Sequence, residues 1–102
     1  MRIIKKSTLR GFWRDHPDAR SFLEMWLAVA KAAEWDSLQD VRADYPHADG
    51  VRVASGNTVT VFNVCGNKYR LIVSIKYRYG IIYIRDFMTH AEYGRNTWIR
   101  RH

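Results

Sequence analysis

The sequence predicts an α+β protein, a small sandwich in which N-terminal helices pack on one face of a mainly antiparallel sheet of three to four strands. Two observations predict this class. In the first half of the chain, apolar residues recur at intervals of three and four. In the second half, segments rich in β-branched and aromatic residues alternate with Gly and Asn turn signals at intervals of about ten residues. A chain of 102 residues without a linker or repeat is expected to form one domain, residues 1–102.

The N-terminal half is predicted to be helical after a short strand. Arg2–Ile4 is a candidate strand, and Ser7–Trp13 is a candidate short helix. The strongest helix signal covers Pro17–Ala33, because proline suits a first helical turn and one apolar stripe follows it. A last short helix is expected between Ser37 and the Tyr45-Pro46 pair, since the residue before a proline disfavours helix. The stripe consists of Phe22, Trp26, Val29, Ala30 and Ala33, widened by Leu23 and Leu27.

The C-terminal half is predicted to form a strand meander. Its segments are Thr58–Val64, Lys68–Arg78 and Ile81–Phe87, with Val51–Val53 as a candidate edge strand. Because the helices precede the strands, we expect the long helix to cover one face of the sheet.

Strand pairing predicts two different sheet faces. If Tyr79-Gly80 is a two-residue hairpin loop, Arg78 pairs with Ile81 and Ser74 pairs with Arg85. A slip of one residue would put Arg85 among the core residues, so the pattern favours a single register. The face turned away from the helices is then expected to carry Lys68, Arg70, Lys76, Arg78, Arg85 and Tyr83.

The charge of the chain is concentrated in its second half. Seventeen Lys and Arg stand against ten Asp and Glu, a formal net charge of +7. The first fifty residues carry equal numbers of acidic and basic side chains, and after them the only carboxylate side chains are Asp86 and Glu92. This asymmetry predicts a polyanionic partner or an anionic substrate for the second half.

Composition excludes several classes of protein. A hydrophobic content of 47% excludes a disordered basic tail. The single cysteine, Cys65, excludes an internal disulfide framework and fits a reducing compartment. The longest apolar run, Met25–Ala30, is too short to cross a bilayer. We therefore expect a small cytoplasmic protein with no membrane partner.

The predicted basic face has two interpretations. Cations interleaved with aromatic rings suit RNA, since phosphates bind the charges and bases stack on the rings. Alternatively, the charges keep an exposed sheet face solvated. A solvated face normally mixes signs, and this one has almost no acid, so nucleic-acid binding is favoured.

A second candidate site is the segment Met88–Arg95, directly after the last predicted strand. It combines His90, which can exchange protons near neutral pH, with the hydroxyl of Tyr93 and the cation Arg95. The alternative is structural: Thr89 caps a short helix, His90 lies on the surface and Tyr93 packs. Spacing alone favours this alternative slightly.

Other chemistries find little support in the sequence. Four histidines and one cysteine show no spacing typical of metal ligands, so no metal is expected. No glycine-rich phosphate loop and no nucleophile-elbow motif occur, and no cofactor is expected.

Two runs of sequence resemble the HigB-type toxins, which share the RelE-like fold. Val61–Val73 is similar to their central strands, and Tyr83–Tyr93 is similar to their closing strand and terminal motif. The resemblance implies a toxin of a type II toxin–antitoxin system, an endoribonuclease that cleaves messenger RNA in the ribosomal A site. It further implies neutralisation by a helix-turn-helix antitoxin of the HigA-like type.

The resemblance also implies roles for individual residues. Arg70 matches the strand arginine that holds the scissile phosphate, and His90 and Tyr93 match the terminal motif that supplies acid–base groups. The flanking phosphates are then expected to contact Lys68, Lys76, Arg78, Arg85 and Arg95. One departure is Gly94, because the position after the motif tyrosine is often acidic in the family.

Two other functions remain open at the level of sequence. A non-catalytic basic module could bind RNA or the ribosome and block it without cutting. A DNA-binding repressor fits less well, because no helix-turn-helix signature carries the positive charge.

Overall fold

The computed structural model describes residues 1–102 and confirms the α+β class. Four α-helices and three short 3₁₀ helices surround one sheet. The helical elements are α1 (Lys6–Asp15), η1 (Pro17–Ala19), α2 (Arg20–Ala32), α3 (Leu38–Asp44), η2 (Tyr77–Tyr79), α4 (His90–Gly94) and η3 (Thr97–Arg101). None of the helices has both the length and the apolar character needed to span a membrane.

The sheet has five strands, one more than the three to four expected. The strands are β1 (Arg2–Ile4), β2 (Asp49–Arg52), β3 (Thr58–Val64), β4 (Tyr69–Lys76) and β5 (Ile81–Thr89), in the spatial order β1-β5-β4-β3-β2. β1 runs parallel to β5, and the other neighbours are antiparallel. The two edge strands, β1 and β2, have only three and four residues, and such short segments show too little alternation to predict a strand firmly. β1 has the bounds of its candidate segment, whereas β2 begins two residues before Val51.

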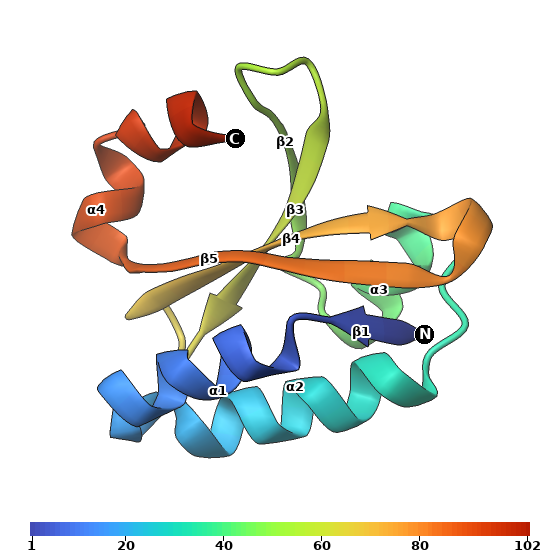
Figure 1. Cartoon of the computed structure of the whole chain (residues 1–102), viewed down its shortest axis with the longest axis horizontal. Coiled ribbons are helices and arrows are strands. Elements are labelled where there is room, and N and C mark those ends of the chain that lie inside the picture. The colour runs from blue at the N-terminus through green and yellow to red at the C-terminus, as the bar shows by residue number, and fades with distance from the viewer.

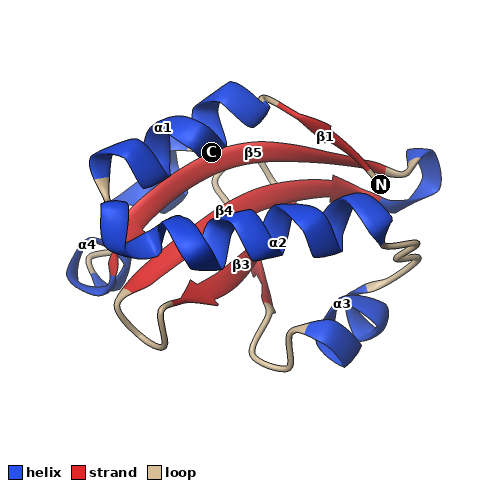
Figure 2. Cartoon of the chain, turned by 90° about the horizontal axis from the view of Figure 1, so that it is seen from below, coloured by secondary structure: helices blue, strands red, loops and turns tan.

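One face of the sheet is covered by α1 and α2, as Figures 1 and 2 show. The predicted stripe of α2 buries Leu23, Trp26 and Ala30 against the sheet. Trp26 meets Phe62 of β3 edge-on, with ring centroids 5.4 Å apart. The long helix therefore packs where its periodicity predicts.

The opposite face is partly covered by the C-terminal segment, residues 90–102, which lies across the sheet from α1 and α2 (Figure 1). Trp98 of η3 is 1% exposed and packs with Ile72 and Met88 in a second hydrophobic cluster. The predicted basic face is therefore covered in part, because one end of it is a small hydrophobic core. Local pattern does not predict this packing, because a single tryptophan shows no periodicity.

The predicted pairing of β4 with β5 is wrong by two residues. Lys76, not Arg78, pairs with Ile81, and Ser74 pairs with Tyr83. The reason is that Tyr77–Tyr79 forms η2 instead of extending the strand, and Gly80 closes the turn at φ 64°. Because the shift is two residues here, Tyr83 and Ile84 keep their predicted faces.

A bulge in β5 alters the far end of the same ladder. Ile72 pairs with Asp86 and Val73 with Ile84, so Arg85 is an extra residue without a partner. Arg85 Nε donates to Ser74 Oγ at 2.9 Å, and Asp86 contacts His102 of the C-terminal segment. The bulge thus turns two consecutive polar side chains toward the face opposite α1 and α2.

Candidate active site

Arg70 lies near the start of β4 and carries an almost buried guanidinium group. The residue is 8% exposed. Its Nη1 donates to the Tyr69 carbonyl at 3.1 Å, and its Nη2 donates to Asn67 Oδ1 at 3.4 Å. No carboxylate forms a salt bridge with it. Because burying a cation without an anion is costly, this site is suited to binding an anionic group.

His90 is brought to Arg70 by the turn that ends β5. The Thr89 hydroxyl accepts from the Glu92 N–H at 3.2 Å, and the Glu92 carboxylate accepts from the Thr89 N–H at 3.1 Å. This capping box starts α4 at His90. The His90 N–H donates to the Lys68 carbonyl at 3.0 Å. The exposed imidazole thereby lies with Nδ1 3.1 Å from Nη2 of Arg70.

The contact with Arg70 decides which nitrogen of His90 carries the ring proton. A guanidinium group only donates, so Nδ1 accepts and the proton of the neutral ring lies on Nε2. An anion that took over the Nη2 donor of Arg70 would free the Nδ1 lone pair. The imidazole is therefore placed to change from acceptor to base when Arg70 binds an anion.

Tyr93 closes the cluster from the next turn of α4. Its ring stacks on Trp98 with centroids 5.2 Å apart, and the Arg70 Cζ lies 5.4 Å from the ring centroid. Burial raises the pKa of the Tyr93 hydroxyl above its usual value, Asp49 raises it further, and Arg70 opposes them. The phenol therefore stays protonated at neutral pH and acts as a hydrogen-bond or proton donor.

Arg70, His90 and Tyr93, singled out from the sequence, thus lie in one cluster. The structural alternative is also correct for this segment, since Thr89 caps the helix, His90 is exposed and Tyr93 packs. Both descriptions hold together because packing of Tyr93 on Trp98 holds α4 against the sheet.

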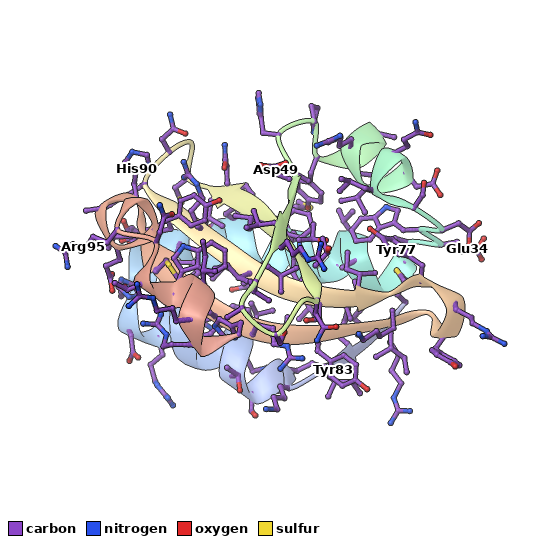
Figure 3. The ribbon with its side chains drawn as sticks, turned by 90° about the horizontal axis from the view of Figure 1, so that it is seen from above. Glu34, Asp49, Tyr77, Tyr83, His90 and Arg95 are labelled. Atoms are coloured by element: carbon purple, nitrogen blue, oxygen red, sulfur yellow. The ribbon has the colours of Figure 1, made fainter.

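Arg95 lies beside this cluster, whereas the side chain of Lys68 extends away from it. Arg95 ends α4, is exposed, and Figure 3 shows it at the same end of the molecule as His90. Lys68 instead forms an ion pair with Asp18 of η1, whose carboxylate also accepts from Tyr69 Oη at 2.9 Å. The hydrogen bonds from Lys68 and Tyr69 lower the pKa of Asp18.

Lys76 and Arg78 lie toward the other end of the sheet. Lys76 is six positions after Arg70 along β4, a span of about 20 Å. Arg78 in η2 covers the Tyr79 ring, with Cζ 5.7 Å from the centroid. Figure 3 shows the neighbouring Tyr77 and Tyr83 far from His90. Only Arg85, bonded to Ser74, lies between the two ends of the basic face.

Three residues of the site were not singled out from the sequence as functional. Asn67 looked only like a turn residue, yet its amide holds Arg70. Asp49 acts electrostatically on Tyr93 from β2, which is distant in sequence. Trp98 donates Nε1–H to the Tyr93 carbonyl at 3.1 Å and fixes α4. For Asn67 there was one usable signal, its position three residues before the strand arginine.

Comparison with known families decides what kind of protein this is. A family model described as HigB_toxin, the RelE-like toxic component of a toxin–antitoxin system, matches residues 19–96. The chain belongs to the HigB_toxin family. It is therefore a toxin of a toxin–antitoxin system, and membership implies an antitoxin partner. No curated protein matches the chain closely enough to count as a relative.

The region matched by the HigB_toxin model contains the whole Arg70 cluster. It begins at Ala19, so β1 and α1 lie outside it, and it ends at Asn96, just before η3. Trp98, which supports Tyr93, is thus outside the matched region. No group of three or more His, Cys, Asp and Glu side chains gathers closely enough to hold a metal ion.

Proposed function

We propose that this toxin is an endoribonuclease that cleaves messenger RNA, in the ribosomal A site, and that a HigA-like helix-turn-helix antitoxin neutralises it. One observation carries the proposal: the almost buried Arg70 has no anionic partner and shares a cluster with an imidazole and a protonated phenol. A cation that holds the phosphate oxygens, a base and an acid are what cleavage of an RNA phosphodiester requires.

In the proposed reaction the RNA supplies its own nucleophile. The 2′-oxygen forms a bond to the adjacent phosphorus while the bond from phosphorus to the 5′-oxygen breaks. The products are a 2′,3′-cyclic phosphate and a free 5′-hydroxyl. One proton leaves the 2′-hydroxyl and one reaches the departing 5′-oxygen, so protons balance.

We assign the residues by their contacts. Arg70 binds the non-bridging oxygens and stabilises the charge that develops on them. Phosphate binding withdraws Nη2 from His90, whose Nδ1 then takes the 2′ proton. Tyr93, protonated in the free protein, donates to the departing oxygen or orients it. Arg95 and Arg85 contact flanking phosphates. Lys76 and Arg78 are too far from Arg70 to contact the same phosphate and would bind RNA further along the chain.

The proposal is tested by mapping RNA ends after induction of the toxin in translating cells. Primer extension should show discrete new 5′ ends with the natural chain and none with Arg70→Ala or His90→Ala. Lys31→Ala, an exposed lysine on α2, is the control and should cut like the natural chain. Intact message with arrested translation would instead support a non-catalytic RNA- or ribosome-binding module.

A further inference from the structure

The turn before β4 and the first residue of that strand hold the Arg70 cluster through three hydrogen bonds. The Lys68 carbonyl accepts from the His90 N–H at 3.0 Å. The Tyr69 carbonyl accepts from Arg70 Nη1 at 3.1 Å, and Asn67 Oδ1 accepts from Arg70 Nη2 at 3.4 Å. The path of the backbone through these three acceptors therefore sets how the guanidinium and the imidazole lie relative to each other.

This turn is not a rigid support by itself. Residues 65–68 are exposed, and Cys65 and Gly66 both have left-handed backbone conformations, at φ 53° and 67°. The Cβ of a cysteine disfavours that conformation, so Cys65 keeps it only where surrounding contacts hold the chain. The position of the turn therefore depends on an attachment outside it.

Asp18 of η1 supplies this attachment. Its carboxylate oxygens lie 2.9 Å and 3.1 Å from Tyr69 Oη, which donates to them, and the carboxylate forms an ion pair with Lys68. The Asp18 carbonyl accepts from Cys65 Sγ at 3.5 Å. Three residues of the turn and of β4 thus meet one aspartate that lies 47 to 51 positions away along the chain.

Asp18 is itself fixed on the sheet by its neighbours. Ala19 is fully buried in the main core. The His16 ring packs on Tyr69 and Phe87, with ring centroids 5.1 Å and 5.3 Å apart. Because residues on both sides of it are packed, the Asp18 carboxylate has a defined position relative to β4.

Asp18 and Arg70 lie on opposite faces of the sheet. Tyr69 and Arg70 are consecutive in β4, so their side chains point to opposite faces. The Tyr69 ring belongs to the core beneath α1 and α2, whereas the Arg70 guanidinium lies against Tyr93. Asp18 therefore acts on the cluster through the backbone of Lys68 and Tyr69, and does not contact a phosphate bound at Arg70.

We propose that Asp18 is a positioning residue of the ribonuclease site: by holding Lys68 and Tyr69 it fixes the backbone carbonyls that place His90 and Arg70. The inference rests on the proposed ribonuclease function and adds to it a residue that contacts no RNA. Asp18 precedes the region matched by the HigB_toxin model, which begins at Ala19. A displacement of about 1 Å in a reacting group can slow a reaction by about a hundredfold, so a contact on the far face of the sheet can control cleavage.

The first test follows the contact between Arg70 and His90 and needs no cleavage. In nitrogen NMR spectra of the full chain, with the His90 ring neutral, Nδ1 should appear as the acceptor and Nε2 as the N–H. Asp18→Asn removes the carboxylate charge, so the share of the Nδ1–H tautomer should rise. Glu24→Gln breaks another exposed ion pair, with Arg20 on α2, and should leave both signals unchanged.

A second variant tests the same contact with a smaller change. Tyr69→Phe keeps the ring packed on His16 but removes the hydroxyl that donates to Asp18. It should shift the His90 signals in the same direction and to a smaller extent. This readout holds even for an Asp18→Asn chain that fails to fold.

The second test measures cleavage of translated message on ribosomes over a range of toxin concentrations. Asp18→Asn should lower the maximal rate by at least about tenfold and change the half-saturating concentration by less than about twofold, because the cations for flanking phosphates are untouched. Asp18→Glu, which keeps the charge, should recover most of the rate. The double variant, Asp18→Asn with Lys68→Met, should stay as slow as Asp18→Asn.

Each outcome separates the positioning role from its alternatives. Unchanged His90 signals, or an unchanged cleavage rate, in Asp18→Asn would overturn it. A natural rate in the double variant would also overturn it, because Asp18 would then serve only to neutralise Lys68. Altered His90 signals in Asp18→Asn, when the natural chain cuts no RNA, would overturn the nuclease proposal and leave the placement of Arg70 and His90 by Asp18 standing.

Discussion

At the scale of single residues, the Arg70 guanidinium is held in place by groups that do not neutralise its charge. Its cation is held by a backbone carbonyl, an amide oxygen, an imidazole nitrogen and an aromatic face, all of them neutral. A carboxylate in their place would satisfy the charge and compete with a phosphate. The neutral partners hold the guanidinium in position and leave its charge available.

The role of the Tyr93 hydroxyl in cleavage can be measured separately from the packing of its ring on Trp98. Tyr93→Phe keeps the ring on Trp98 and the contact with Arg70 but removes the hydroxyl, so we expect RNA cleavage to slow by about a hundredfold. The midpoint of thermal unfolding should stay within about 2 °C of the natural value, since packing is retained. Cleavage kinetics and thermal unfolding measure the two effects.

The control for this variant is Tyr79→Phe. Tyr79 is 69% exposed in η2 and far from the cluster, so its hydroxyl should not matter to cleavage. Equal cleavage by Tyr93→Phe and the natural chain would show that the phenol serves packing only.

At the scale of elements, the C-terminal segment decides whether the cluster is assembled. Its α4 has only five residues, too few to be stable alone, so contacts with the sheet hold it in place. Trp98 provides the apolar contact. Asp86 of β5 provides the polar one, accepting from Arg101 at 3.0 Å and lying 2.9 Å from His102 Nε2.

Asp86 makes this attachment dependent on pH. Burial acts to raise the pKa of its carboxyl, but hydrogen bonds from His102 and Arg101 outweigh burial and lower it below the usual 3.8. The stabilisation is therefore present above about pH 4 and lost as the pH falls through the lowered pKa. We expect Asp86→Asn to reduce the free energy of unfolding by about 1 kcal/mol at pH 6, with the difference narrowing by pH 3.

Denaturant unfolding at both pH values measures this difference. Asp15→Asn, an exposed aspartate with no ion pair, is the matched control and should follow the natural chain at both. A difference for Asp86→Asn that stayed constant down to pH 3 would mean that the carboxylate charge is not what holds the segment.

At the scale of the whole molecule, the net charge of +7 does not say which cations are free to bind RNA. That depends on where each cationic side chain lies and whether it forms an ion pair. Lys68 is neutralised by Asp18 beside η1, and Arg101 by Asp86. Arg95 and Arg85 have no carboxylate partner and lie with Arg70 on the face opposite α1 and α2, or at its end. These three arginines therefore form a group of cations without a carboxylate partner on that side of the molecule.

This distribution predicts how RNA binding responds to salt. For a single-stranded 2′-O-methyl RNA, which cannot be cut by its own 2′-hydroxyl, affinity should fall as salt rises. Arg95→Ala should reduce the slope of log K against log salt by about 0.7, the value for one lost phosphate contact on a single strand. Lys68→Ala should leave the slope unchanged because its partner is Asp18. Equal slopes for all three chains would place the RNA elsewhere.

Much of the fold could be predicted from local pattern. The bounds of Thr58–Val64 match the prediction, and α2 lies within Pro17–Ala33. The errors fall where tertiary contacts outweigh propensity: Tyr77 and Arg78 have strand-like neighbours but form η2, and Arg85 is expelled into a bulge. Neither has a local signal, because the helical turn and the bulge depend on how β4 and β5 pair.

The sequence by itself determined the chemistry available to this toxin. It contains a strand arginine, and a His and a Tyr three residues apart after a helix cap, and periodicity assigns Arg70 to the face away from α1 and α2. Only the tertiary structure decided which of these groups meet. Seating Trp98 on the sheet brings Tyr93 to Arg70, and packing η1 on the sheet brings Asp18 to Lys68 and Tyr69. Contacts between residues far apart in sequence depend on packing, which local pattern does not encode.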